Sequence, residues 1–159
     1  MTVPPVSNHT AAPGTATLNS TYLCTANVVI GKKLDPIPLL EGGLRIVEPI
    51  TSGSIHGPGF NATIEGGFAA PIVVLDGNSK ETKSQKPFIY VYGHADDGSP
   101  FYIEELGFGP GLVQNTRAII QVGGKYQGLQ SLYVLGQVSI NEDRTAASAE
   151  LFSVPLPTE

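Results

Sequence analysis

The order of apolar and polar residues along the chain predicts short β-strands separated by turns. Apolar positions never keep the period of a helix, about 3.6 residues, over three turns. Apolar, β-branched runs instead alternate with segments rich in Gly, Pro and Asp, which is typical of strands and turns. We expect strands over residues 22–30, 44–50, 60–65, 72–76, 88–95, 101–106, 118–122, 131–140 and 146–154. About eight or nine such strands favour an all-β fold, either an antiparallel barrel or a sandwich.

The segment 51–67 is the most glycine-rich part of this pattern, with glycine at positions 53, 57, 59, 66 and 67. Glycine adopts backbone conformations that are closed to other residues, so we expect a strand that ends at Ile50, a tight connection, and a return strand from Phe60. His56 and Glu65 lie in this segment. We expect these two side chains to converge on a cavity.

The predicted strand 88–95 has two chemically different faces, because successive side chains in a strand point to opposite sides. Three in-line aromatic rings are a large area to leave in water, so we expect the aromatic face to line a cavity. The alternative is that the aliphatic face packs a core and the aromatic rings face solvent. The aromatic face carries Phe88, Tyr90, Tyr92 and His94, and the aliphatic face carries Ile89, Val91, Gly93 and Ala95.

Further polar side chains would join such a cavity if the sheet closes. Glu104 and Glu105 alternate in one strand, so one of the two must point inward. Arg45, Arg117 and Tyr133 lie in other predicted strands. Polar groups of this kind among apolar walls position a ligand, and they suit an oxygenated aromatic or polyketide-like small molecule.

Length and charge restrict the partners. A chain of 159 residues predicts one domain, which we place at 21–159 after a loosely ordered, Pro- and Thr-rich arm at 1–20. A net charge of −5 argues against nucleic acid. No long apolar run or basic cluster indicates a membrane. The expected partner is a small molecule, and the assembly we consider is a homodimer.

The single cysteine, Cys24, excludes an intrachain disulfide and lies in an apolar run, where we expect a buried, inert thiol. Residues 1–20 lack the basic start and hydrophobic block of a signal peptide, so we expect a cytoplasmic protein. The Asn-X-Ser/Thr triplets at Asn8, Asn19 and Asn61 are then expected to be chance occurrences.

No motif for a cofactor or a metal is found. The chain has no phosphate-binding loop, no dinucleotide-binding glycine pattern and no nucleophile elbow. The spacing of His56 and His94 matches no metal-binding motif. We therefore expect chemistry without a cofactor and without a metal.

The segment from Arg45 through Ser-Ile-His-Gly-Pro-Gly-Phe to Gly66-Gly67 resembles a family of small β-barrels, domain of unknown function 3237. The unit Tyr90-Val-Tyr-Gly-His-Ala-Asp-Asp-Gly-Ser-Pro-Phe-Tyr-Ile is similar to the same family. The resemblance implies an antiparallel, lipocalin-like barrel with a central cavity. It also implies a cofactor-free isomerase or cyclase, by analogy with natural-product enzymes. Family members follow the Gly-Gly pair with a small residue and Asp-Trp, whereas this chain has Phe68-Ala-Ala, so we expect a different ligand.

Our leading hypothesis is a cofactor-independent isomerase or cyclase of natural-product biosynthesis that acts on an aromatic or polyketide-derived molecule. A chalcone-isomerase-like oxa-Michael ring closure is one form of it, in which an acid–base group moves a phenolic proton. The alternatives are a non-catalytic lipocalin-like carrier of a hydrophobic small molecule, and a structural module with a filled interior. The predicted proton-transfer residues are His56, Glu65 and His94, and the predicted substrate-binding residues are Arg45, Tyr90, Tyr92, Glu105, Arg117 and Tyr133.

Overall fold

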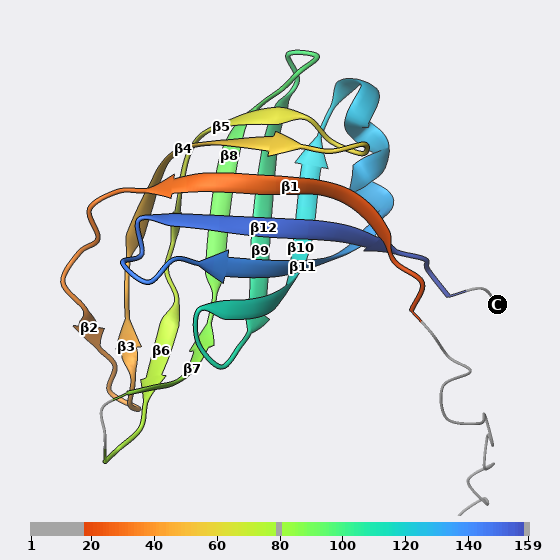
Figure 1. Cartoon of the computed structure of the whole chain (residues 1–159). Helices are drawn as coiled ribbons and strands as arrows, with labels where there is room; N and C mark the ends of the chain where they lie inside the picture. Colours follow the sequence, from red (N-terminus) through yellow and green to blue (C-terminus); the bar gives the residue numbers. More distant parts are fainter. Residues whose placement is uncertain (1–17, 79–80, 158–159) are drawn as a thin grey trace, which may run out of the picture.

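The computed structural model describes residues 18–78 and 81–157, and within them eight strands close an antiparallel barrel (Figure 1). Neighbouring strands pair in the order β1-β12-β11-β10-β9-β8-β5-β4, and β4 pairs with β1 to complete the ring. This confirms the predicted all-β antiparallel barrel. The barrel strands are β1 (Thr21–Ile30), β4 (Glu48–His56), β5 (Ala62–Ala69), β8 (Phe88–Ala95), β9 (Pro100–Phe108), β10 (Val113–Val122), β11 (Tyr133–Ile140) and β12 (Ala146–Val154).

Alternate residues of these strands point into the barrel and form its core. On β10 the alternation is strict, because every second side chain from Gln114 to Val122 is buried and those between are exposed. Ile64, Ile103 and Leu151 are almost fully buried in the same core. Burying one large aliphatic side chain stabilises a fold by about 1.5–3 kcal/mol, so this inner face supplies most of the driving force for closing the barrel.

The two ends of the barrel are covered differently. At one end lies the 3-10 helix η1 (Gly124–Ser131), which contributes Tyr126 and Leu129 to the core. The Tyr126 ring packs 4.9 Å from Phe60, and Phe60 packs 5.5 Å from Phe101. Figure 1 shows a smaller sheet at the opposite end. In the described residues this sheet has the order β2-β3-β6-β7: β2 (Ile37–Pro38), β3 (Leu44–Arg45), β6 (Ile72–Leu75) and β7 (Thr82–Lys86).

The expectation that a strand ends at Ile50 is wrong, because β4 continues to His56. Ile55 is fully buried in the core, which holds this part of the segment in the barrel wall. Gly53 lies within β4 and not in a turn. Glycine fits this position because a Cβ there would lie next to the backbone oxygen of Asn27 on β1. The turn follows at residues 57–61, where the Asn61 side-chain amide donates to the Gly57 carbonyl oxygen at 2.9 Å.

Strand β10 begins at Val113, five residues before the predicted start, and this difference also has a physical reason. Gln114 and Thr116 are polar, so the pattern suggested a connection, but both side chains are buried inside the barrel. Two further elements lie between the predicted strands: the helix η1 follows Val122, and β7 pairs with β6.

Two sequence predictions fall mostly or wholly outside the described residues. The predicted arm at 1–20 is described only from residue 18, and Asn8 is not among the described residues. Across 18–78 and 81–157, no helix has the length and apolar character needed to cross a membrane.

Candidate functional site

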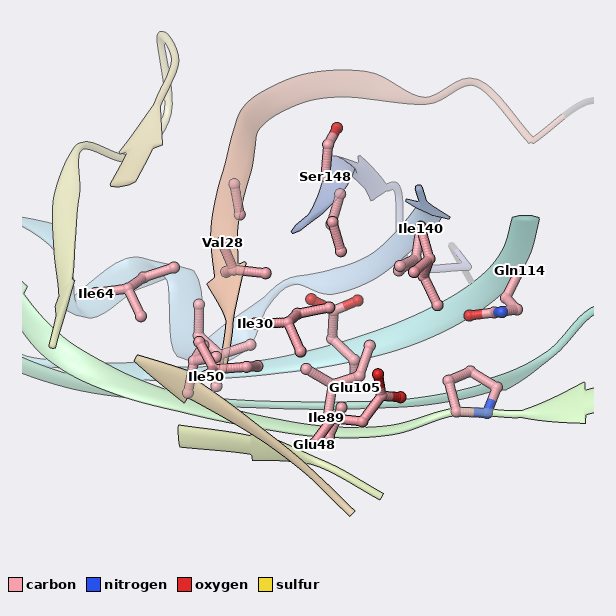
Figure 2. A pocket seen from close by; sticks show the side chains of 18 of the residues that line it. Val28, Ile30, Glu48, Ile50, Ile64, Ile89, Glu105, Gln114, Ile140 and Ser148 are labelled. Carbon is pink, nitrogen blue, oxygen red and sulfur yellow. The ribbon is translucent and has the colours of Figure 1, made fainter. Parts of the chain in front are cut away.

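A cavity lies inside the barrel, toward the end that carries the small sheet. Its volume, counted as the space open to the centres of water-sized molecules, is about 50 Å³. This is room for roughly three to five waters. Its walls are almost wholly aliphatic, from inward-pointing residues such as Val28, Ile50, Ile64 and Ile89 (Figure 2). Sites that hold drug-sized ligands are about 300–1,000 Å³, so this cavity is far smaller and holds at most a ligand with a single ring.

Glu105 is the acidic group in the middle of these apolar walls. It lies on β9 and is 5% exposed, and it lines the cavity together with aliphatic residues such as Ile30 and Ile89 (Figure 2). Thr116, on the neighbouring strand β10, donates a hydrogen bond from Oγ1 to Glu105 Oε2 at 2.9 Å. Burial raises the pKa of Glu105 to about 7, and the Thr116 hydrogen bond partly opposes this rise. The carboxyl group can therefore both accept and donate a proton near neutral pH.

The glycine opposite this carboxyl group, Gly136 on β11, makes room for it. A Cβ at Gly136 would lie 2.6 Å from Thr116 Oγ1 and 3.5 Å from Glu105 Oε2. The first distance is too short for any real contact, so a larger residue would displace the Thr116 hydroxyl. Gly136 therefore allows the Thr116–Glu105 hydrogen bond to form in the core.

A buried ion pair lies at the small-sheet end of the cavity. Arg144, in the hairpin between β11 and β12, binds both carboxylate oxygens of Glu48 on β4, at 3.1 and 2.5 Å. The Glu48 side chain is 1% exposed and that of Arg144 is 12% exposed, so Arg144 shields the Glu48 carboxylate from solvent. Arg144 has a positive φ of 56°, uncommon for a residue with a side chain. The hairpin backbone thus places the guanidinium over the barrel end.

Two glutamines extend the ion pair into a polar cluster. Arg144 Nη1 donates to Gln85 Oε1 at 3.4 Å, and Gln114 Nε2 donates to the same oxygen at 3.5 Å. Gln114 Nε2 also donates to the Gly111 carbonyl oxygen at 2.6 Å. Gln85 and Gln114 are 2% and 1% exposed. Three members of this cluster, Glu48, Gln114 and Arg144, line the cavity and make one end of it polar.

The expectation that the aromatic face of 88–95 lines the cavity is wrong. Val91 and Ala95 are buried inside the barrel, whereas Tyr92 is 53% exposed on the outside. Tyr90 also lies outside, where its ring packs 5.0 Å from Phe68. The reason is space, because the interior of an eight-stranded barrel is narrow and a row of aromatic rings does not fit beside the opposite wall.

The three residues predicted to transfer protons lie away from the cavity. His94 Nδ1 and Glu65 Oε1 are 2.7 Å apart, so the structure does bring these two together. Their side chains are 53% and 47% exposed on the outer surface. His56, the last residue of β4, is exposed beside Thr25 of β1. Catalytic roles for these residues stay predictions.

Of the remaining predicted substrate-binding residues, one lies inside the barrel and the others lie outside it. Glu105 lines the cavity. Arg45 donates from Nη1 to the Ala70 carbonyl oxygen at 2.7 Å and lies over the Phe88 ring. Arg117 lies over the Tyr133 ring, 4.7 Å from its centroid, on the outer face of β10 and β11. Arg117 and Tyr133 thus belong to the outer surface of the barrel and Arg45 to the small sheet, and none of the three lines the cavity.

Four polar residues of the site, Glu48, Gln85, Gln114 and Arg144, were not singled out from the sequence. Glu48 precedes a proline at the start of a strand, and Arg144 follows Asn-Glu-Asp in a polar turn, so neither pattern indicates burial. The sequence does contain a signal for Gln114. Gln114 and Thr116 continue, two residues at a time, the series of positions that the apolar Ala118 and Ile120 occupy. Extending that alternation backward would have placed Gln114 inside the barrel.

Cys24 is fully buried, as expected, and burial raises the pKa of its thiol to about 12, with the nearby charge of Glu105 adding to the rise. The thiol therefore stays protonated and is not a nucleophile at neutral pH. In the described part of the chain, no group of three or more His, Cys, Asp or Glu side chains is arranged to hold a metal ion.

The fold is shared with solved structures at low sequence identity. A conserved protein of unknown function from Rhodopseudomonas palustris aligns with a TM-score of 0.72 at 21% identity, covering 89% of this chain and all of that one. A beta-barrel like protein from Acinetobacter baumannii aligns with a TM-score of 0.72 at 14% identity, covering 91% of this chain and all of that one. An enzyme from Penicillium herquei aligns with a TM-score of 0.67 at 18% identity, covering 88% and 97%.

No protein-family model matches the sequence, and no curated protein matches it. Identities this low establish a shared fold and no more. The chain is thus similar in fold to small β-barrel proteins, two of them described as of unknown function and one of them as an enzyme. Membership of domain of unknown function 3237 stays a prediction from the motifs around residues 45–67 and 90–103.

Proposed function

We propose that the barrel interior is an acid–base site that isomerises or cyclises a small aromatic molecule without a cofactor. The observation that carries the proposal is Glu105, a carboxyl group enclosed by aliphatic side chains with a pKa near 7. A group with such a pKa exchanges protons most effectively at neutral pH. The Penicillium herquei barrel, which is described as an enzyme, supports a catalytic role.

An intramolecular oxa-Michael addition fits this arrangement, because it needs one group that takes a proton and returns it. Ionised Glu105 accepts the proton of a phenolic O–H, and the phenolate oxygen attacks the β-carbon of a conjugated enone. A C–O bond forms, the C=C π bond breaks, and an enolate results. Protonated Glu105 then donates the proton to the α-carbon. Atoms and charge balance, so no oxidant, reductant or cofactor is required.

Neighbouring residues have supporting roles in this scheme. Thr116 orients the Glu105 carboxylate and keeps its pKa from rising further. Among the described lining residues Arg144 is the cation, but Glu48 binds it through both carboxylate oxygens, so Arg144 holds the polar end of the cavity rather than binding an anion. The apolar walls exclude water, which strengthens the Thr116–Glu105 hydrogen bond.

The alternative function is that of a carrier for a small hydrophobic molecule. It is supported by the nearly continuous aliphatic lining, since a carrier requires only shape and apolar wall. The two functions differ in what Glu105 does. A carrier tolerates its replacement, whereas the acid–base site does not.

The proposal can be tested with a single-ring substrate, which is chosen to match the small size of the cavity. An aryl vinyl ketone with an ortho-hydroxyl group closes to a bicyclic ketone by the addition described above, and its disappearance can be followed by absorbance. We expect the protein to accelerate this reaction and Glu105→Gln to lower kcat/KM roughly a hundredfold or more. The rate of the parent protein should rise with pH through about 7, as Glu105 ionises.

Two further variants make the test specific. Glu104→Gln is the matched control, because Glu104 is the adjacent carboxylate and points to the opposite face of β9. Thr116→Val removes the hydrogen bond that lowers the Glu105 pKa, so the midpoint of the pH profile should move to higher pH. Equal rates for the parent protein and Glu105→Gln would refute the acid–base role and leave the carrier.

A further inference from the structure

One polar atom in the cavity has no partner. Of the buried side-chain nitrogen and oxygen atoms in the described part of the chain, Gln114 Oε1 is the one that makes no hydrogen bond. The side chain is 1% exposed, and Figure 2 shows its oxygen pointing toward the side of the cavity where Glu105 lies. Burying an unpaired acceptor costs about 1–3 kcal/mol, so this orientation calls for a donor in the cavity.

The direction of the Gln114 amide is fixed by its surroundings. Nε2 donates to the Gly111 carbonyl oxygen at 2.6 Å and lies 3.5 Å from Gln85 Oε1. Rotating the amide by half a turn would place Oε1 against these two acceptors, which cannot donate to it. The oxygen therefore faces the cavity, and its missing partner must be a donor that the protein does not supply.

The charges around the cavity define what this donor can be. Arg144 is the cation among the described lining residues, and Glu48 binds it through both oxygens. Glu105 adds negative charge when ionised. An anionic ligand would thus find no free cation and would face a carboxylate, whereas a neutral hydroxyl group supplies the donor that Gln114 needs.

We propose that Gln114 recognises a hydroxyl group on a neutral, ring-sized ligand bound in the barrel cavity. This rests on the proposed function, since it names the substrate class of that site. Gln114 and Glu105 occupy adjacent strands, but Glu105 pairs with Ala118, four residues along β10 from Gln114. The two backbone positions are therefore about 13 Å apart along the strand, and the two side chains contact opposite ends of the ligand.

Binding of phenol and toluene to the parent protein and to Gln114→Met tests the proposal. The two probes have nearly the same shape, but only phenol carries a hydroxyl donor. NMR titration gives both affinities, and toluene reports in each protein whether the cavity is intact. We expect Gln114→Met to weaken phenol roughly three- to tenfold and to leave toluene within about twofold. Gln121→Met, on the exposed face of the same strand, should change neither affinity.

Several results would overturn the proposal. Two concern Gln114→Met: an equal change in its affinities for phenol and toluene, or no change in its affinity for phenol. Two concern the parent protein: binding of benzoate as tight as that of phenol, or no binding of either phenol or toluene. A crystal structure of the parent protein with phenol gives a test that needs no variant. The hydroxyl should lie within hydrogen-bond distance of Gln114 Oε1. An ordered water that keeps this position while phenol binds elsewhere would show that Gln114 has a structural role only.

The same probes separate this proposal from the proposed function. Glu105→Gln should abolish turnover while the phenol-to-toluene preference persists, because Gln114 is unchanged. If Glu105→Gln turns over normally and the preference persists, the acid–base role fails and the hydroxyl site stands. If turnover depends on Glu105 but Gln114→Met affects both probes equally, the hydroxyl site fails and the acid–base role stands.

Discussion

The inner and outer faces of β8, β9 and β10 are made by the same strands but carry opposite chemistry. Inside, Ile89 and Val91 surround a single carboxyl group, Glu105. Outside, Tyr92 and Tyr102 pair directly across β8 and β9, and both are at least one-third exposed. The outer face thus holds most of the aromatic and charged residues of these strands, but the inner face holds an enclosed acid, Glu105, in the same cavity as Glu48 of β4. Enclosure, rather than the number of functional groups, identifies the candidate site.

The same contrast appears in two pairs of contacting side chains. The inner pair, Glu48–Arg144, is 1% and 12% exposed, and the outer pair, Glu65–His94, is 47% and 53% exposed. Charges removed from water depend on their partners, whereas charges in water are solvated with or without them. The distances alone would rank these pairs as similar, so burial decides which one matters for stability.

Arg144→Ala should have the largest effect on stability. It leaves the Glu48 carboxylate buried without a partner, and breaking a buried pair in this way costs about 3–5 kcal/mol. Urea unfolding measures the loss. The double variant Glu48→Leu with Arg144→Met should recover most of it, since no uncompensated charge remains. A loss of less than about 1 kcal/mol in Arg144→Ala would show that the pair behaves like a surface pair.

Glu105→Gln should change how stability depends on pH. Because the folded-state pKa of Glu105 is raised from 4.5 to about 7, its contribution is fully present below about pH 4.5 and is lost as pH rises through 7. Glutamine does not titrate, so the variant should gain about 3 kcal/mol relative to the parent protein between pH 4.5 and pH 8.

Urea unfolding at several pH values measures this difference, and titrations shared by both proteins cancel. Glu104→Gln again serves as the control from the outer face of β9. A constant difference between Glu105→Gln and the parent protein across this range would mean that Glu105 ionises as an exposed carboxyl group does, and the acid–base site would lose its basis.

Gly136→Ala should have an intermediate effect. The added methyl group would meet Thr116 Oγ1 and Leu151 Cδ2, at 2.6 and 2.8 Å, so the core must shift. Overpacking of this kind costs about 1–3 kcal/mol. The displaced Thr116 hydroxyl should also raise the Glu105 pKa, which a titration followed by NMR would detect. Gly123→Ala is the control, because a Cβ at Gly123 meets nothing within 4 Å. Equal stability of the two variants would contradict the tight packing.

The fold could be predicted from the sequence because strand alternation and turn residues are local signals. The predicted bounds of 88–95 and 146–154 match β8 and β12. The site could not be predicted in the same way, because alternation defines two faces without saying which is inside. Closure of the barrel decides that, and it depends on the volume available across the lumen. Arg144 and Glu48 are 96 residues apart, so their pairing has no local signal.

Replacing Glu65 or His94 should have the smallest effect. The two side chains are about half exposed, and such surface pairs contribute about 0–1 kcal/mol. Glu65→Gln and His94→Gln should each lower stability by less than about 1 kcal/mol and leave turnover of the ortho-hydroxy enone unchanged, because neither side chain lines the cavity. The measurements are urea unfolding and the absorbance assay, with Glu105→Gln as the variant that must lose activity in the same experiment. A loss of activity in both His94→Gln and Glu65→Gln comparable to that in Glu105→Gln would move the catalytic site to the outer face of β5 and β8. It would also support two of the three proton-transfer residues that the sequence predicts, Glu65 and His94.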